Sequence, residues 1–88
     1  MTEETKLKQA IKKYLRLKGW YVYHNLAGLG VHPGIPDFTA IKDGVVVQIE
    51  VKTPKGKLSE NQMLFCDEWI THGGRYWVIR SIEEAMAI

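Results

Sequence analysis

The sequence predicts an α/β fold in which a mixed four-stranded sheet is flanked by helices. The predicted order is helix, three strands, helix, strand, helix. Three observations lead to this prediction. Residues 2–18 repeat apolar side chains at helical spacing, and residues 37–52 alternate apolar and polar side chains about an Asp43-Gly44 pair. Residues 59–80 then combine a helix-start signal with a β-rich segment, as in a strand–helix–strand crossover.

The first helix is expected over Thr2–Lys18, and Gly19 is typical of a helix C-terminus. One apolar stripe is expected to face the core: Leu7, Ala10, Ile11, Tyr14 and Leu15. Trp20–His24 is aromatic and β-branched, which predicts a strand. Residues 25–36 contain three glycines and two prolines, so we expect a loop there.

The next two strands, residues 37–42 and 45–52, are expected to form a hairpin. The Asp43-Gly44 pair favours a two-residue turn, because both central residues need positive φ. Such a turn pairs residues whose numbers sum to 87, which places Asp37 opposite Glu50. One face would then be wholly apolar and lie on the core: Phe38, Ala40, Val45, Val47, Ile49 and Val51. The other face is expected to stay unburied and carries Asp37, Thr39, Gln48, Glu50 and Lys52.

The second helix is expected to begin at Ser59, where Ser59-Glu60-Asn61-Gln62 fits a capping box, and to end before Gly73-Gly74. Its inward face is expected to carry Gln62, Met63, Cys66, Trp69 and Ile70, with Leu64 and Phe65 off that face. This helix allows the strand at 75–80 to join the sheet in parallel. A short last helix is expected from Ser81 to about Ile88.

Composition points to one intracellular domain, residues 1–88. Hydrophobic residues make up 45% and charged residues 25%, which is typical of a globular chain, and no apolar run reaches the length of a membrane span. The start of the chain does not resemble a secretory signal, and the single cysteine excludes an intrachain disulfide.

Charge is distributed unevenly along the chain. Residues 1–58 carry ten Lys and Arg against five Asp and Glu, whereas residues 59–88 carry two against five. Such a basic region can attract a polyanion, and the candidate contacts are Lys12 and Arg16 on the first helix with Lys55 and Lys57 after the hairpin. The alternative for the helix residues is a plain solvated face.

The strongest candidate site is the pair Asp37 and Glu50. Two carboxylates that face each other repel unless a cation neutralises them, and hard oxygen ligands suit Mg²⁺ or Mn²⁺. Lys52 lies on the same face and can act on the attacking water or on the charge that grows on a phosphate. The alternative is structural: an exposed Glu50–Lys52 ion pair and a turn-capping Asp37.

Two further side chains are weaker candidates. Glu4 falls within the apolar arc of the first helix and can turn toward a metal, or it can simply favour the helix N-terminus. Gln62 completes the capping box and can also hold a phosphate or order Lys52. His24, His32, His72 and Cys66 lack the mutual spacing of a zinc site.

These residues together resemble a known family. Pro36-Asp37, twelve residues and then Glu50-Val51-Lys52 match the PD-(D/E)xK nuclease signature. More narrowly, the chain resembles the VRR-NUC group of virus-type replication and repair nucleases. The further residues that carry this resemblance are Glu4 in the opening helix, Gly34-Ile35 before Pro36, Leu58-Ser59 with Gln62, and Gly73-Gly74.

The resemblance covers nearly the whole chain. It implies a restriction-endonuclease-like core, a DNA substrate and dependence on Mg²⁺ or Mn²⁺. In this analogy Asp37 and Glu50 bind metal with a contribution from Glu4, Lys52 is catalytic and Gln62 supports it. Stand-alone members of this length are similar to phage and bacterial Holliday junction resolvases, which act in DNA repair as homodimers. Two alternatives stay open, a less selective flap or duplex nuclease and a non-catalytic nucleic-acid-binding module.

Overall fold

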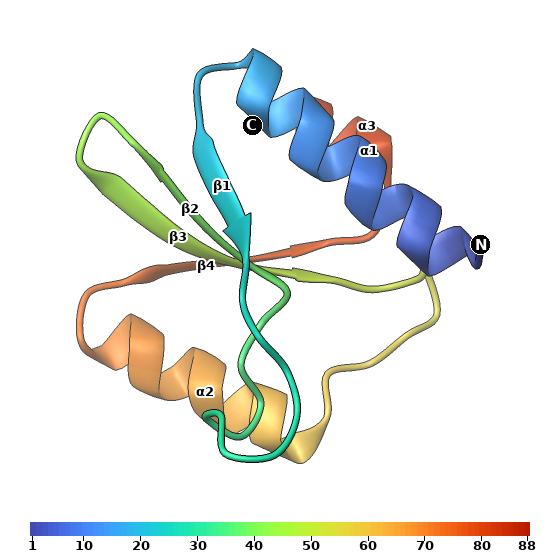
Figure 1. The fold of residues 1–88 in the computed structure, drawn as a ribbon. Helices are drawn as coiled ribbons and strands as arrows, with labels where there is room; N and C mark the ends of the chain where they lie inside the picture. The colour runs from blue at the N-terminus through green and yellow to red at the C-terminus, as the bar shows by residue number, and fades with distance from the viewer.

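A four-stranded sheet lies between two layers of helices in the computed structural model, which describes all 88 residues (Figure 1). The elements in chain order are α1 (Glu3–Leu17), β1 (Tyr21–His24), β2 (Phe38–Lys42), β3 (Val45–Val51), α2 (Glu60–Thr71), β4 (Arg75–Ile79) and α3 (Ile82–Met86). Helices α1 and α3 cover one face of the sheet and α2 lies on the other (Figure 1). This confirms the predicted α/β fold and its element order. None of the helices has the length and apolar character needed to cross a membrane.

The sheet has the strand order β1-β2-β3-β4. The first three strands are antiparallel, and β4 joins β3 in parallel after α2. At the hairpin turn Asp43 and Gly44 have φ angles of 51° and 80°, as the two-residue turn requires. Phe38 pairs with Ile49 and Thr39 with Gln48, so the predicted register is confirmed.

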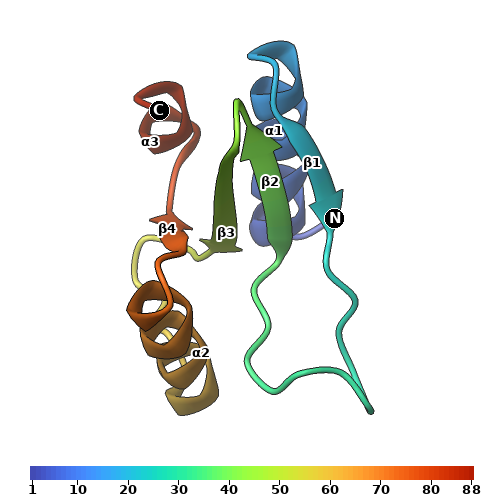
Figure 2. The same cartoon turned by 90° about the vertical axis from the view of Figure 1, so that its left-hand side faces the viewer.

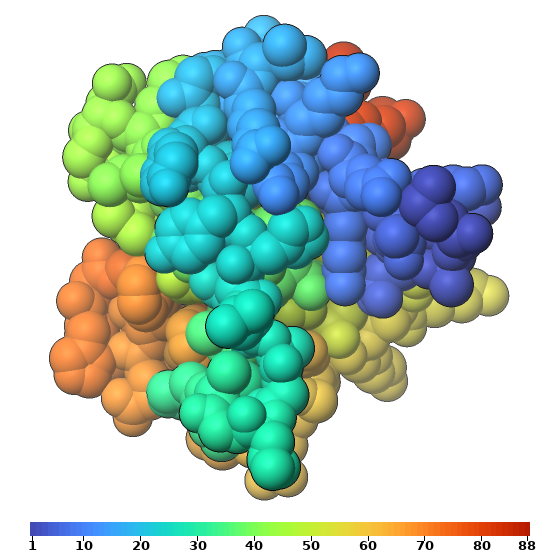
Figure 3. All heavy atoms as spheres, in the orientation of Figure 1, coloured from blue at the N-terminus to red at the C-terminus, as the bar shows by residue number.

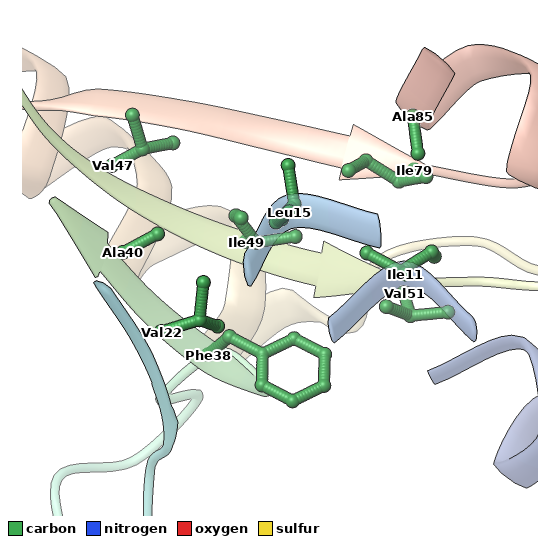
Figure 4. Close-up of a cluster of buried hydrophobic side chains, with 10 residues drawn as sticks. All are labelled: Ile11, Leu15, Val22, Phe38, Ala40, Val47, Ile49, Val51, Ile79 and Ala85. Atoms are coloured by element: carbon green, nitrogen blue, oxygen red, sulfur yellow. The ribbon is translucent and has the colours of Figure 1, made fainter. Parts of the chain in front are cut away.

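The core lies between the sheet and the α1–α3 layer (Figure 4). It contains ten buried apolar residues: Ile11, Leu15, Val22, Phe38, Ala40, Val47, Ile49, Val51, Ile79 and Ala85. The hairpin residues among them are those of the predicted apolar face, although Val45 is only half-buried. Their alternation places every second side chain on α1, so the opposite face of the hairpin is left to α2 and the preceding loop.

Helix α2 faces the sheet with a different stripe from the one expected. Gln62, Phe65, Cys66 and Trp69 are half-buried, whereas Met63 and Ile70 are 49% and 53% exposed, so the prediction was wrong for these two and for Phe65. The observed stripe follows helical spacing from Gln62, whose side chain the capping box holds at the N-terminus. Phe65 stacks on Trp69, with ring centroids 6.0 Å apart.

The polar face of the hairpin is buried where α2 covers it, which the sequence did not predict. Gln48 and Glu50 are only 6% and 4% exposed. The loop of residues 25–36 extends beyond β1 and β2 alongside α2 (Figure 2). It approaches α2 so closely that a Cβ on Gly34 would lie 2.2 Å from the carbonyl oxygen of Asn61. This contact requires glycine, both for space and because φ is +72°.

Candidate active site

Asp37 and Glu50, hereafter the acid pair, lie at one end of the hairpin. The β2–β3 ladder ends at the Phe38–Ile49 pair, so Asp37 and Glu50 are the next residues outward. Asp37 is anchored there, since its Oδ2 accepts a hydrogen bond of 2.8 Å from the backbone N–H of Val51. In Figure 3, α1 (blue), the loop (teal) and the segment after β3 (yellow) meet on one face of the molecule.

The environment of the acid pair opposes full ionisation. Burial raises the pKa of Glu50, and the charge of Asp37 and a hydrogen bond between the two carboxyl groups raise it further, to about 8. The positive charges of Lys52 and Lys8 act in the opposite direction but do not compensate. Without a further cation, the environment therefore favours the protonated form of Glu50.

Lys8 lies directly against the acid pair, a contact that the sequence did not predict. Its Nζ is 3.0 Å from Oδ1 of Asp37 and 3.8 Å from Oε2 of Glu4. Partial burial disfavours the charged form of Lys8, but the hydrogen bond to Asp37 and the charges of Asp37, Glu4 and Glu50 outweigh it, so the pKa of Lys8 is raised. In the sequence, the position of Lys8 one helical turn after Glu4 was the signal that could have predicted its contact with these carboxylates.

Glu4 is connected to the acid pair through Lys8. Its side chain is 44% exposed. No three Asp, Glu, His or Cys side chains are close enough together to hold an ion by themselves. Of the three carboxylates predicted to bind metal, the structure thus brings Asp37 and Glu50 together and leaves Glu4 as a neighbour of Lys8.

Gln62 completes the capping box and, in addition, contacts Glu50 rather than Lys52. Its Oε1 accepts a hydrogen bond of 2.8 Å from the backbone N–H of Ser59, which completes the capping box. Its Nε2 lies 3.5 Å from Oε2 of Glu50. The start of α2 is therefore tied to the acid pair by a single side chain.

Lys52 and the two basic residues of the following turn lie just beyond β3. The backbone N–H of Lys52 donates to the carbonyl oxygen of Ile79 at 3.1 Å, which extends the pairing with β4 by one residue. Lys55 and Lys57 are exposed. The guanidinium group of Arg80 donates to the carbonyl oxygens of Thr53 and Gly56, so this turn is held to the end of β4.

Lys12 and Arg16 lie together on the surface of α1. With Gln9, Lys13, Leu17 and His24 they line a hollow of about 490 Å³. Arg16 also donates a hydrogen bond of 3.2 Å to the carbonyl oxygen of Val22, which ties α1 to β1. Burial and then the charge of Lys12 lower the pKa of His24, which favours the neutral form of this imidazole.

Asn25 organises the backbone around Asp37, although the sequence pattern indicated only a loop at this position. Its Nδ2 donates to the carbonyl oxygen of Pro36 and to Oε1 of Gln48, each at 3.0 Å. Its backbone N–H donates to the carbonyl oxygen of Asp37 at 2.9 Å. Its Oδ1 accepts from the hydroxyl group of Thr39 at 2.7 Å. One asparagine thus holds the carbonyl groups of both Pro36 and Asp37.

Replacing Asn25 with Ala is expected to lower the free energy of unfolding by about 2–3 kcal/mol, because Gln48 and Thr39 lose hydrogen-bond partners in a partly buried site. Urea denaturation followed by circular dichroism measures this change. Asn61→Ala, at an exposed position early in α2, is the control and should change stability by less than about 1 kcal/mol. Equal losses in the two variants would contradict the role given to Asn25.

Residues 3–83 match the family model described as the VRR-NUC domain. The chain belongs to the VRR-NUC domain family. A solved structure described as a VRR_NUC domain shares the fold, with a TM-score of 0.86 and 22% sequence identity over 99% of this chain and 94% of that chain. No curated protein matches the sequence. Membership makes this chain a nuclease-type domain and confirms the resemblance seen in the sequence.

The acid pair of this VRR-NUC domain has the donor chemistry for a hard divalent cation. Mg²⁺ characteristically takes one or two protein carboxylates and fills its other positions with water and substrate phosphate. Asp37 and Glu50 supply that number, and a bound cation would offset the burial and the repulsion from Asp37 that raise the pKa of Glu50. The residues present therefore fit Mg²⁺ or Mn²⁺.

Proposed function

We propose that this VRR-NUC domain is a metal-dependent, structure-specific endodeoxyribonuclease. It hydrolyses phosphodiester bonds and resolves four-way (Holliday) junctions as a homodimer inside the cell. The observation that supports this most is the acid pair, in which Glu50 is buried and Asp37 is partly buried, in a nuclease-type fold with Lys52 two residues beyond Glu50. A structural ion pair on the surface would have no need of such burial.

The acid pair holds the metal ion, and Glu4 contributes to its binding. When bound, Mg²⁺ or Mn²⁺ polarises the phosphate and acidifies a water molecule. The ammonium group of Lys52 orients the attacking water or offsets the charge that grows on the phosphate oxygens. Gln62 keeps Glu50 in place through the 3.5 Å contact, and α2 excludes water from that side.

DNA binding depends on basic residues around the site. Lys12 and Arg16 contact the phosphate backbone along the hollow on α1, and Lys55 and Lys57 contact it from the turn that Arg80 holds. Such contacts release counterions, so affinity should fall steeply with salt concentration. They carry no sequence information, which suits recognition of DNA shape.

Homodimerisation follows from the geometry of the reaction. One chain offers one acid pair, and symmetric cuts in two strands need two sites at a fixed separation, which a two-fold dimer supplies. Exposed apolar side chains are available for such a contact, among them Tyr21 and Tyr23 on β1 and Leu64 on α2. Phe65, by contrast, is engaged with Trp69 and Tyr76.

Cleavage of a fixed four-way junction, compared with a linear duplex of the same sequence, tests the proposal. With Mg²⁺ or Mn²⁺ the junction should be cut at least about tenfold faster, and EDTA should abolish cutting. Lys52→Met should bind the junction but not cut it. Equal rates on both substrates would instead indicate the less selective nuclease, and an absence of cutting with either metal would contradict the proposed activity.

A further inference from the structure

We propose that Lys8 is a tethered cation that occupies the acid pair until a divalent ion binds and then contacts the DNA phosphate at the same site. The second step rests on the proposed function, and the first does not. This assigns to the reaction a further catalytic residue on α1, beside those that the nuclease signature contains.

The contact between Lys8 and Asp37 differs from an ordinary surface ion pair. The two side chains are 27% and 19% exposed, and their charged atoms are 3.0 Å apart. On the same helix, Lys6 and Glu3 form a pair at 3.8 Å with side chains 58% and 90% exposed. Surface pairs of that kind contribute little, whereas a partly buried pair is less screened by water.

Both oxygens of Asp37 are already engaged. Oδ2 accepts from the backbone N–H of Val51 at 2.8 Å, and Oδ1 is the oxygen that Lys8 contacts. An ion that binds Asp37 therefore meets the ammonium group of Lys8 at Oδ1. Because like charges repel, the ion and Lys8 compete for this carboxylate.

The position of Lys8 on α1 determines which groups its side chain can reach once a divalent ion has displaced it from Asp37. Lys8, Lys12 and Arg16 follow one another at intervals of one helical turn, and the last two line the basic hollow. A substrate phosphate at the acid pair would supply a new anion for Lys8. Lys8 keeps its charge and can offset the negative charge that develops there.

A Mn²⁺ titration by isothermal calorimetry, without DNA, tests the first step. Lys8→Met keeps most of the length of the side chain and removes the charge, so Mn²⁺ should bind about fivefold or more tightly than to the wild type. Lys8→Arg retains a cation and should bind Mn²⁺ with nearly wild-type affinity. Lys6→Met is the matched control on the same helix and should cause no change. If K8M does not fold, Lys8→Gln takes its place.

Cleavage at saturating Mn²⁺ tests the second step. K8M should lose at least about tenfold in kcat/KM on the DNA substrate, and K8R should retain most of the activity. The combination of tighter metal binding with slower cutting is what a purely structural ion pair would not produce. Unchanged or weaker Mn²⁺ binding by K8M would overturn the first step, and wild-type cutting by K8M would overturn the second. If the wild type cuts no DNA, the proposed function and the second step fail, while the titration still decides the first.

Discussion

Asp37→Asn is expected to lower the rate of DNA cleavage by at least about a thousandfold while the chain stays folded. The amide oxygen of Asn can still accept the hydrogen bond from Val51 N–H, so the end of the hairpin keeps its geometry. The variant loses the negative charge that pairs with Lys8 and that would hold a divalent cation. Single-turnover cleavage with Mn²⁺ measures the rate, and calorimetry should show weaker Mn²⁺ binding.

The control for this variant is Asp43→Asn in the hairpin turn. Asp43 has φ of 51°, and Asn-Gly suits that turn as well as Asp-Gly does, so the fold is preserved. Asp43 lies at the opposite end of the hairpin from the acid pair, so the D43N variant should cut DNA at the wild-type rate. D37N should also bind junction DNA about as tightly as the wild type. Undiminished cutting by D37N would exclude Asp37 as a metal ligand.

Glu50→Gln is expected to inactivate the enzyme and yet stabilise the metal-free protein at pH 8. The pKa of Glu50 is raised from 4.5 to about 8 in the folded chain, so the folded state holds a proton that the unfolded state releases. The contribution of Glu50 to stability is complete below pH 4.5 and is lost as the pH rises through 8. Glutamine carries no charge at any pH, so this loss disappears in the variant.

Urea unfolding in EDTA at pH 5 and pH 8 measures the effect. Between these two values the wild type should lose about 2 kcal/mol or more relative to E50Q. Glu60→Gln, at an exposed position in the first turn of α2, should follow the wild type. An E50Q variant less stable than the wild type at pH 8 would contradict the raised pKa of Glu50. For the same reason, Mn²⁺ should bind the wild type more tightly as the pH rises toward 8, with release of a proton.

The sequence by itself determined the elements of the fold and the register of the hairpin. These follow from local physics: the φ requirement of Asp43-Gly44, the two-residue alternation of 45–51 and the capping box at Ser59. The register then places Asp37 beside Glu50, so the sequence alone predicts the acid pair. Lys52 follows from the same alternation.

Only the tertiary structure decided what surrounds the acid pair. Lys8 and Asn25 approach Asp37 from α1 and from the end of β1, and no local pattern states where those segments lie relative to the hairpin. Glu50 is buried because α2 covers its face of the sheet, with the stripe that begins at Gln62. Burial and the nearest charges set the pKa of a carboxyl group, and both arise from contacts between segments far apart in the chain. Local sequence patterns thus identify the two acids. Their protonation and the contact between Asp37 and Lys8 depend on the tertiary structure.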